Sequence, residues 1–224
     1  MISPLIPASE PTQRTAVYVD AFNLYYGVLK GNPKLKWLDL NAFFKSLRND
    51  EEIISIKYFT AEIIGKKIGI ANPTLDRQRR YISALRTLPN VTIIYGKYQL
   101  KWEKCGGYCR REYQKPEEKK TDVGIAVSII SDAVDGLMDR IVLVSGDSDL
   151  EPAIIWVRAR YPKIKIVVYI PEEENSLSPR RNDSYKNIGV QAQILPARPL
   201  VRCQFPDSLG PERGPEIVRP KEWA

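Results

Sequence analysis

Acidic residues follow two apolar runs that each predict a buried strand. The stretch VLVSGDSDLEPAI, residues 142–154, passes from such a run through a Ser-Gly turn to Asp147 and Asp149. Asp20 ends another short apolar run, and Asp122 opens a helical pattern directly after a basic segment. Carboxylates gathered in one place repel one another, so they need a counter-ion to stay ionised together.

A hard divalent cation is the counter-ion that fits these carboxylates. Mg²⁺ and Mn²⁺ prefer oxygen ligands and, in two-metal or one-metal sites, activate a water and hold a phosphate for in-line displacement. Ligands of an open parallel sheet bind beyond the carboxyl ends of its strands, where the strand order reverses. If the strands before Asp20 and Asp147 are neighbours, we expect Asp20, Asp122 and Asp147 to face one crevice.

The same residues also have structural interpretations. Asp147 or Asp149 can cap the helix that follows, and Asp122 can cap its own helix. Asn23, three residues after Asp20, either caps, packs or orients that aspartate. Glu151 stands in a first helical turn, where an acid favours the helix dipole. Tyr25 and Tyr26 belong to the first helical pattern. We interpret them as core residues in preference to platforms for base stacking.

The chain contains no histidine. Imidazole acid–base catalysis, Ser-His-Asp triads and His-ligated metal sites are therefore excluded. Hydrolysis by this chain has to use carboxylates, a metal, or Lys, Tyr or Cys side chains. The 34 Lys and Arg residues exceed the 27 Asp and Glu residues by seven, which fits either a polyanionic partner or a solubilising surface.

Positive charge is concentrated in residues 97–120, KYQLKWEKCGGYCRREYQKPEEKK. This segment holds eight Lys or Arg and four Glu, with Trp and Tyr residues between them. Phosphate contacts and base stacking by such a segment would hold a nucleic-acid strand, and a solvated surface is the alternative interpretation. The residues expected to contact phosphates are Arg110, Arg111, Lys119 and Lys120.

The three cysteines cannot form a complete disulfide framework, which favours a reducing cytoplasm. Cys105 and Cys109 form a C-x₃-C pair in KCGGYC. Structural zinc needs four ligands, and only Cys203 remains besides this pair. A zinc half-site, a redox pair and plain free thiols all stay open.

Predicted strands and helices alternate for about 180 residues, which predicts a parallel sheet flanked by helices. The helix over 121–134 is expected to be capped by Thr121 and to bury Val123, Ala126, Val127 and Ile130. Asp39 is expected to cap the helix over 40–47. The predicted strands are 16–20, 53–61, 90–100, 141–144, 163–170 and 190–195, and the other predicted helices are 21–31, 72–88, 149–161 and 178–189.

The chain divides into three parts on composition. Residues 1–14 are expected to form a disordered, Pro-containing N-terminal arm without the features of a secretory signal. Residues 15–195 form the predicted α/β domain, and residues 196–224 a Pro-rich extended C-terminal tail. No stretch approaches the roughly 18 apolar residues of a membrane span. The tail and exposed strand edges leave a homodimer open.

Three stretches together resemble a known family. AVYVDAFNLYYGV, EEKKTDVGIAVSII and IVLVSGDSDLEPAI, in this order and at these separations, resemble the NYN domain, in the LabA-like branch of the PIN-like nuclease superfamily. The resemblance runs from about Thr15 to Leu195. It implies a Rossmann-like, three-layer α/β/α PIN-like domain with a mainly parallel sheet, whose acidic residues bind Mg²⁺ or Mn²⁺ and hydrolyse RNA.

The resemblance assigns roles to individual positions. It makes Asp20, Asp122 and Asp147 the metal ligands, with Asp149 and Asn23 completing the catalytic set. Glu118 and Lys119 precede Asp122 as in the family pattern, and Ser145 and Ser148 are possible supporting hydroxyls. The insertion around KCGGYC departs from the pattern. The tail from Gln204 is similar to a C-terminal extension of bacterial members.

The leading hypothesis is a cytoplasmic, metal-dependent endoribonuclease that cuts single-stranded or structured RNA. The alternative is a non-catalytic RNA-binding or regulatory module with the same fold, because fold does not fix function. A small-molecule phosphatase is disfavoured, since the first strand is followed by D-A-F-N and lacks a D-x-D pair.

Overall fold

The computed structural model describes residues 12–62, 72–106, 109, 111–172, 183–210 and 216–224. Within these ranges, residues 98–100, 113–118 and 183 are described by their backbone alone. Most of the arm expected over 1–14 lies outside the described residues, and the first strand begins at Gln13.

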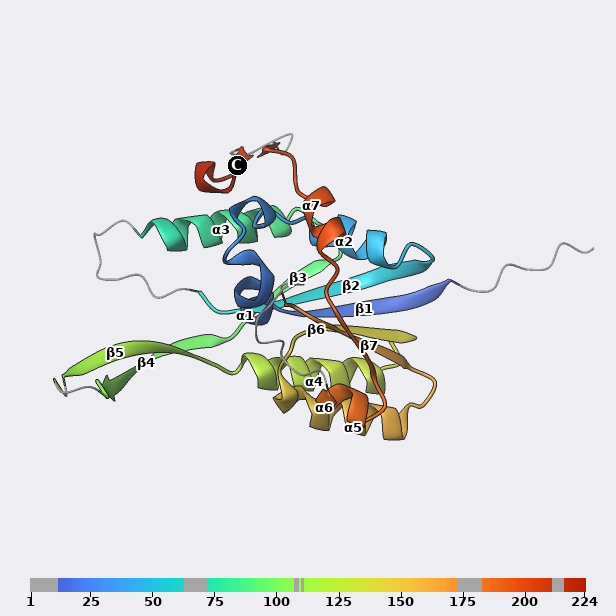
Figure 1. Cartoon of the computed structure of the whole chain (residues 1–224). Helices are drawn as coiled ribbons and strands as arrows, with labels where there is room; N and C mark the ends of the chain where they lie inside the picture. Colours follow the sequence, from blue (N-terminus) through green and yellow to red (C-terminus); the bar gives the residue numbers. More distant parts are fainter. Residues whose placement is uncertain (1–11, 63–71, 107–108, 110, 173–182, 211–215) are drawn as a thin grey trace, which may run out of the picture.

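Six parallel strands form the central sheet, in the spatial order β3-β2-β1-β6-β7-β8. The mixed α/β fold with a parallel sheet flanked by helices is therefore confirmed (Figure 1). The strands are β1 (Gln13–Asp20), β2 (Glu51–Thr60), β3 (Val91–Tyr95), β6 (Arg140–Val144), β7 (Lys165–Ile170) and β8 (Gln191–Ile194).

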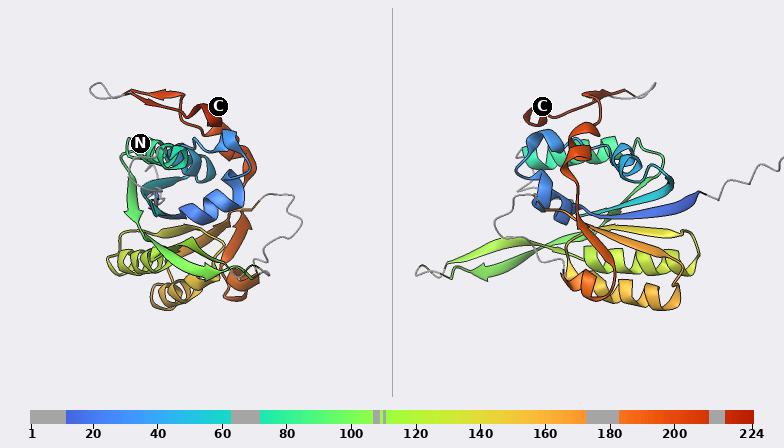
Figure 2. Two further views of the ribbon diagram at one scale, coloured as in Figure 1. Left: turned by 90° about the vertical axis from the view of Figure 1, so that its left-hand side faces the viewer. Right: turned by 45° about the vertical axis from the view of Figure 1, so that its right-hand side comes forward.

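Helices cover both faces of the sheet, as Figures 1 and 2 show. Successive residues of β1 point to opposite faces, so Val17 and Val19 join one core cluster and Ala16 and Tyr18 the other. Burial on both sides explains why the central strands are continuous apolar runs. On one face lie α1 (Ala21–Leu24), α2 (Leu40–Leu47), α3 (Pro73–Leu85) and α7 (Ala197–Arg202); on the other lie α4 (Thr121–Val134), α5 (Glu151–Arg160) and α6 (Asp183–Asn187).

Helix starts follow from short polar side chains. Asp39 caps α2 as expected, because its Oδ1 accepts a hydrogen bond from the Ala42 amide at 2.9 Å. The expectation for Thr121 was wrong, because Thr121 is already helical and the capping position belongs to Lys120. Lys120 adopts a left-handed conformation with φ of 77°, which is uncommon for a residue other than glycine.

The buried face of α4 also differs from the prediction. Val123 and Val127, expected in the core, are 67% and 60% exposed. The fully buried apolar residues are instead Ile125, Ile129 and Ala133, while Ala126 and Ile130 are partly buried against the same core. The sequence of α4 is apolar on more than one face, so the spacing of three and four residues fits two different sets.

The predicted strand over 90–100 is divided at Gly96 into β3 and β4 (Lys97–Lys104). The Gly96 amide donates to the carbonyl of Thr60 at 2.7 Å, after which the chain leaves the sheet. β4 pairs antiparallel with β5 (Glu112–Lys119), and the two strands form an arm that projects from the body (Figures 1 and 2). The basic segment 97–120 is this arm and its junction with α4.

The chain after Pro196 packs against the α2–α3 side of the domain. It contains α7, the short strands β9 (Ser208–Leu209) and β10 (Ile217–Val218), and a 3₁₀ turn over Lys221–Trp223. The Trp223 side chain is buried, with its ring centre 6.2 Å from that of Trp37. Among the described residues, none of the helices has the length and apolar character needed to cross a bilayer.

Candidate active site

The candidate site lies where the strand order reverses. β1 and β6 are parallel neighbours, with Val19 opposite Val144, so Asp20 and Ser145 stand side by side just beyond this pair. The sheet extends from here through β2 and β3 on one side and through β7 and β8 on the other. This arrangement produces the crevice in which parallel α/β sheets bind their ligands.

Asp20 is buried, with 2% of its surface exposed, and it caps α1. Its Oδ1 accepts hydrogen bonds from the Phe22 and Asn23 amides at 3.0 and 2.9 Å. Its Oδ2 accepts from Asn23 Nδ2 at 2.6 Å and from Ser145 Oγ at 3.1 Å. Burial raises the pKa of Asp20 above its ordinary value, although these hydrogen bonds favour the charged form.

A chain of hydrogen bonds joins the ends of β1 and β6. Asn23 donates to Asp20 and accepts from the Gly146 amide at 3.2 Å. Ser145 Oγ accepts from the Asp147 amide at 3.1 Å while it donates to Asp20. The loop that carries Asp147 is therefore held to Asp20 by two side chains.

Asp147 and Asp149 begin the segment that leads into α5. The Asp147 side chain accepts from the Asp149 amide at 2.9 Å, so Asp147 caps the 3₁₀ turn over Ser148–Leu150. The capping position of α5 itself belongs to Leu150, so neither aspartate caps that helix. Its main-chain carbonyl accepts a hydrogen bond from the Tyr185 hydroxyl. Asp149 is exposed, whereas Asp147 is partly buried.

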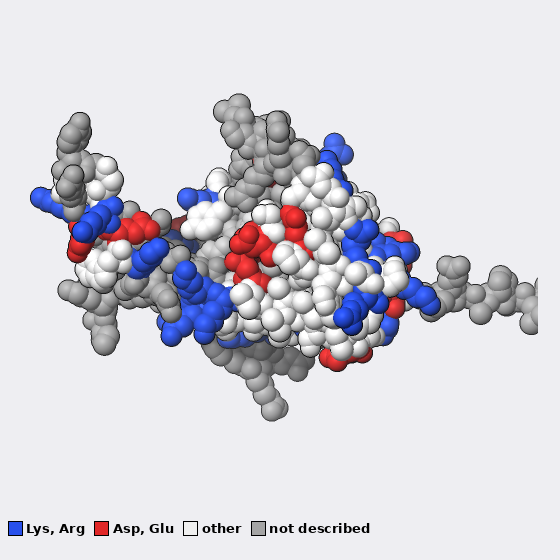
Figure 3. All heavy atoms as spheres, turned by 90° about the horizontal axis from the view of Figure 1, so that it is seen from below, with Lys and Arg blue, Asp and Glu red and all other residues white. Residues whose placement is uncertain are grey.

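Asp122 faces the same group of carboxylates from the first turn of α4. Its pKa is raised to about 6, first by burial and then by the charges of Asp147, Asp20 and Asp149. The four aspartates are thus close enough for their charges to interact. Figure 3 shows acidic side chains gathered on the lower face of the body, with Lys and Arg side chains between them and the arm.

Three further polar residues adjoin this cluster. Burial raises the pKa of the Tyr185 hydroxyl, and the charges of Asp147 and Glu151 add to the effect. Thr121 Oγ1 and Glu151 Oε1 are buried and have no hydrogen-bond partner among the described residues. Sequence reasoning missed Tyr185, since nothing in NDSYKNIG marks it, and treated Thr121 and Glu151 only as helix-start residues.

Carboxylate oxygens are the donors that a hard cation prefers. Burial is the main cause of the raised pKa of Asp122, and a bound cation would relieve the carboxylate repulsion that adds to it. The geometry is less complete. Among the described residues, no group of three or more Cys, Asp or Glu side chains is arranged to hold a metal ion. The four hydrogen bonds to Asp20 already occupy its acceptor positions, which leaves Asp122, Asp147 and Asp149 with the more accessible oxygens.

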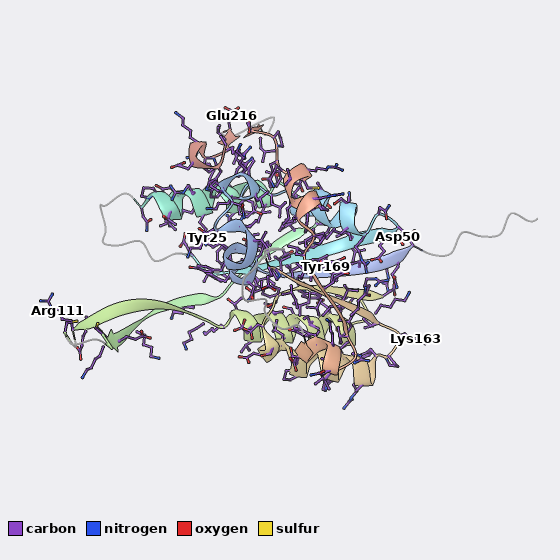
Figure 4. The ribbon with its side chains drawn as sticks, viewed as in Figure 1. Tyr25, Asp50, Arg111, Lys163, Tyr169 and Glu216 are labelled. Atoms are coloured by element: carbon purple, nitrogen blue, oxygen red, sulfur yellow. The ribbon has the colours of Figure 1, made fainter. Side chains whose placement is uncertain are left out.

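The four expected phosphate-contact residues are distributed along the arm. Lys119 and Lys120 are exposed at its root, directly before Asp122 in the chain. Arg111 is exposed at its far tip, away from the carboxylates (Figure 4). Arg110 lies outside the described residues. The arm therefore brings two of these four residues to the edge of the site.

All three cysteines are free thiols. Cys105 and Cys109 lie at the tip end of the arm, and main-chain hydrogen bonding at Arg111 lowers the pKa of Cys109. Cys203 is distant in the fold, where its Sγ lies 3.7 Å from Ser46 Oγ. The part of the chain that the structure describes therefore does not support a zinc site at KCGGYC.

Comparisons with known proteins found one matching family, a related enzyme and a solved structure of similar fold. The family model of the NYN domain matches residues 14–186. The 6-hydroxy-3-succinoylpyridine 3-monooxygenase of Pseudomonas putida is 33% identical over 245 residues, covering 96% of this chain and 76% of that protein. A crystal structure of a Vibrio parahaemolyticus protein of unknown function superposes with a TM-score of 0.53 at 22% identity, over 85% of this chain and 97% of that one, and supports the fold.

Proposed function

Because the chain belongs to the NYN domain family, whose fold is that of the PIN-like nucleases, we propose that it is a metal-dependent endoribonuclease. The observation that carries the proposal is the cluster of Asp20, Asp122, Asp147 and Asp149 at the β1–β6 edge, where mutual repulsion contributes to the raised pKa of Asp122. A polyanionic substrate does not enter such a site unless the acidic charge is neutralised.

The residues proposed to hold Mg²⁺ or Mn²⁺ are Asp20, Asp122 and Asp147. When bound, the ion supplies a water of lowered pKa and neutralises charge on the scissile phosphate. Asp122 and Asp147 offer accessible oxygens, whereas Asp20 contacts the ion directly only if one of its four hydrogen bonds is exchanged. Without that exchange its charge still contributes to the field at the site.

The other residues position these groups. Asn23 and Ser145 hold the Asp20 carboxylate and the Asp147 loop in one arrangement. Tyr185 holds the Asp147 carbonyl from α6. Asp149 has an exposed side chain beside this loop, and its proposed role is to accept a proton from the attacking water. Lys119 and Lys120 contact phosphates of the RNA strand next to the cut.

Metal binding by the cluster is tested by titrating Mn²⁺ into purified, chelator-treated protein in a calorimeter. The wild type is expected to bind Mn²⁺, and Asp147→Asn to bind at least tenfold more weakly. Asp207→Asn provides a matched control, because Asp207 is an exposed tail residue whose partner is Arg219. Equal Mn²⁺ affinity in all three proteins contradicts the assignment.

A second candidate function follows from the relative in Pseudomonas putida, whose name describes oxygenation of a substituted pyridine. Identity of 33% over nearly the whole chain favours a shared activity. The chain contains no G-x-G-x-x-G dinucleotide-binding pattern, so a redox cofactor would need another kind of site. Consumption of NADH or NADPH and O₂ with formation of an oxygenated product from 6-hydroxy-3-succinoylpyridine, with or without added flavin, would establish this function. No oxygenated product under either condition would contradict it.

A further inference from the structure

A cavity of about 630 Å³ opens beside the root of the arm, between α3 and the end of β3. Its size falls within the range of about 300–1,000 Å³ that is usual for small-molecule sites. The polar and aromatic residues that line it come from three separate segments, and they are Glu62, Arg79, Ser83, Arg86, Tyr95 and Lys97.

The cavity lies on the same edge of the sheet as the carboxylate cluster. Asp20 pairs with Phe59, and Phe59 pairs with Ile94, so Tyr95 stands one residue beyond the row of Asp20 and two strands away. Strands are about 4.8 Å apart, which places Tyr95 roughly 10 Å from Asp20 along this edge. Neighbouring nucleotides of one strand can span that distance.

The cavity has a surplus of positive charge. Arg79 pairs with Glu62 at 2.7 Å, but within the described part of the chain the Arg86 guanidinium donates only to the neutral Tyr95 hydroxyl, at 3.1 Å. Lys97 is exposed and has no carboxylate partner among the described residues. Two of the three cations are therefore available to an anion.

An aromatic ring stands next to these cations. The Tyr95 side chain is 47% exposed although it ends a strand of the sheet. Exposed aromatic rings beside basic groups hold unpaired bases by stacking while the cations hold phosphates. A nucleotide has both parts, a flat base and a phosphate, in one ligand.

We propose that this cavity binds one nucleotide of an RNA strand, a position that flanks the scissile bond. The base stacks on Tyr95, and Arg86 and Lys97 contact the adjoining phosphates. This inference rests on the proposed nuclease function for its position relative to the cut, but the binding itself does not require catalysis. Lys97 is also the first residue of β4, so the cavity is continuous with the basic arm.

RNA binding is measured first without cleavage. A fluorescein-labelled oligouridylate is titrated with protein in EDTA, and anisotropy is recorded at several salt concentrations. Arg86→Glu combined with Lys97→Glu is expected to weaken binding at least tenfold. The slope of log K against log salt should fall by about 0.7 for each phosphate contact that is lost.

The control replaces the same number of charges elsewhere. The control variant combines Lys163→Glu with Lys165→Glu. These residues lie at the opposite end of the strands, away from the arm and the site (Figure 4). This protein is expected to keep nearly wild-type affinity and salt dependence. Equal losses in the two double variants would mean that only the overall charge matters, and would overturn the proposal.

Stacking is tested at Tyr95 in the same assay. Tyr95→Ala is expected to weaken binding about tenfold, the order of one base–aromatic stack. Tyr95→Phe removes only the hydroxyl that contacts Arg86, and it is expected to keep most of the wild-type affinity for RNA. If Tyr95→Ala binds as tightly as wild type, the base does not occupy this cavity. Thermal unfolding of each variant checks that the exposed substitutions leave the fold intact.

A small activated phosphodiester, bis-p-nitrophenyl phosphate, separates this proposal from the proposed function. Its hydrolysis in Mn²⁺ uses the carboxylate cluster and does not reach a second nucleotide position. The cavity variants are expected to hydrolyse it at the wild-type rate. If no protein hydrolyses it or cuts RNA, but the binding results hold, the nuclease proposal fails and the nucleotide site stands.

Discussion

Asn23 Nδ2 donates a hydrogen bond to Asp20 Oδ2 at 2.6 Å, while Asn23 Oδ1 accepts one from the Gly146 amide at 3.2 Å. One amide side chain therefore links the carboxylate after β1 to the loop after β6. The link requires a donor and an acceptor on the same side chain, which an amide provides and a carboxylate does not.

Replacing Asn23 with Asp tests this link. The substitution keeps the size of the side chain but puts a second negative charge against the buried Asp20 carboxylate. We expect metal-dependent RNA cleavage to fall by about tenfold to a hundredfold, because a hydrogen bond to a charged group contributes about 1.5–3 kcal/mol. Rates are compared with those of Asn41→Asp, which changes an asparagine distant from the site. Wild-type rates in Asn23→Asp would contradict the role of this bond.

The raised pKa of Asp122 predicts a stability that depends on pH. Because the folded-state pKa is about 6 and the ordinary value is 3.8, ionisation disfavours the folded state. This penalty is absent below the ordinary value and fully present above pH 6. In EDTA at pH 8, Asp122→Asn should therefore raise Tm by about 2–4 °C, which corresponds to about 1 kcal/mol after allowance for its partial exposure.

The pH and metal dependence of this difference identify its cause. The gain in Tm for Asp122→Asn should shrink as pH falls from 6 toward 4, where the wild-type carboxyl is protonated in the fold. Mn²⁺ should raise the Tm of wild type at pH 8 and have little effect on the variant. A Tm difference that is constant across pH would contradict the electrostatic origin.

Tyr185 and Tyr81 form a matched pair that separates an effect on the position of the Asp147 loop from an effect on the stability of the fold. Each is buried, and each donates its hydroxyl to a main-chain carbonyl, of Asp147 and Leu38 respectively. Both Tyr→Phe variants should lose about 1 kcal/mol of unfolding free energy in urea. Only Tyr185→Phe should also weaken Mn²⁺ binding and slow RNA cleavage, because only its bond holds the Asp147 loop. Equal cleavage rates in the two variants would refute a positioning role.

The tail is predicted to be part of the folded unit. Trp223 contacts Trp37 and Tyr81 with ring centres 6.2 Å apart, so Trp223→Ala leaves a cavity between buried rings. We expect a loss of about 3 kcal/mol of unfolding free energy, measured by urea denaturation. Arg202→Ala, an exposed change in the same tail, should alter it by less than about 0.5 kcal/mol. A small effect of Trp223→Ala would show that the tail contributes little.

The positions of the aspartates were accessible to sequence reasoning because they depend on topology. An apolar run followed by an acid places that acid at the carboxyl edge of a parallel sheet, and this is where Asp20 and Asp147 lie. That β1 and β6 are neighbours had to be assumed, since strand order depends on packing across the whole domain. The cap of α4 was misplaced by one residue because Lys120 takes a left-handed conformation that its residue type does not predict.

The arm and the supporting residues were less accessible. β5 has the sequence EYQKPEEK, whose charges and proline are atypical of a strand, so its pairing with β4 was not foreseen. Tyr185 reaches Asp147 from 38 positions away in the chain. The cavity at Tyr95 combines residues of α3, β3 and β4, none of which forms a motif on its own.

RNA cleavage by the carboxylate cluster with a divalent metal can be measured directly. The most direct measurement incubates end-labelled single-stranded and hairpin RNAs with wild type and Asp147→Asn in Mn²⁺, Mg²⁺ or EDTA. We predict internal cuts by wild type in Mn²⁺ or Mg²⁺, none in EDTA, and at least a hundredfold slower cutting by Asp147→Asn. Intact RNA in every wild-type reaction, or equal cutting by the variant, would contradict metal-dependent cleavage by this cluster.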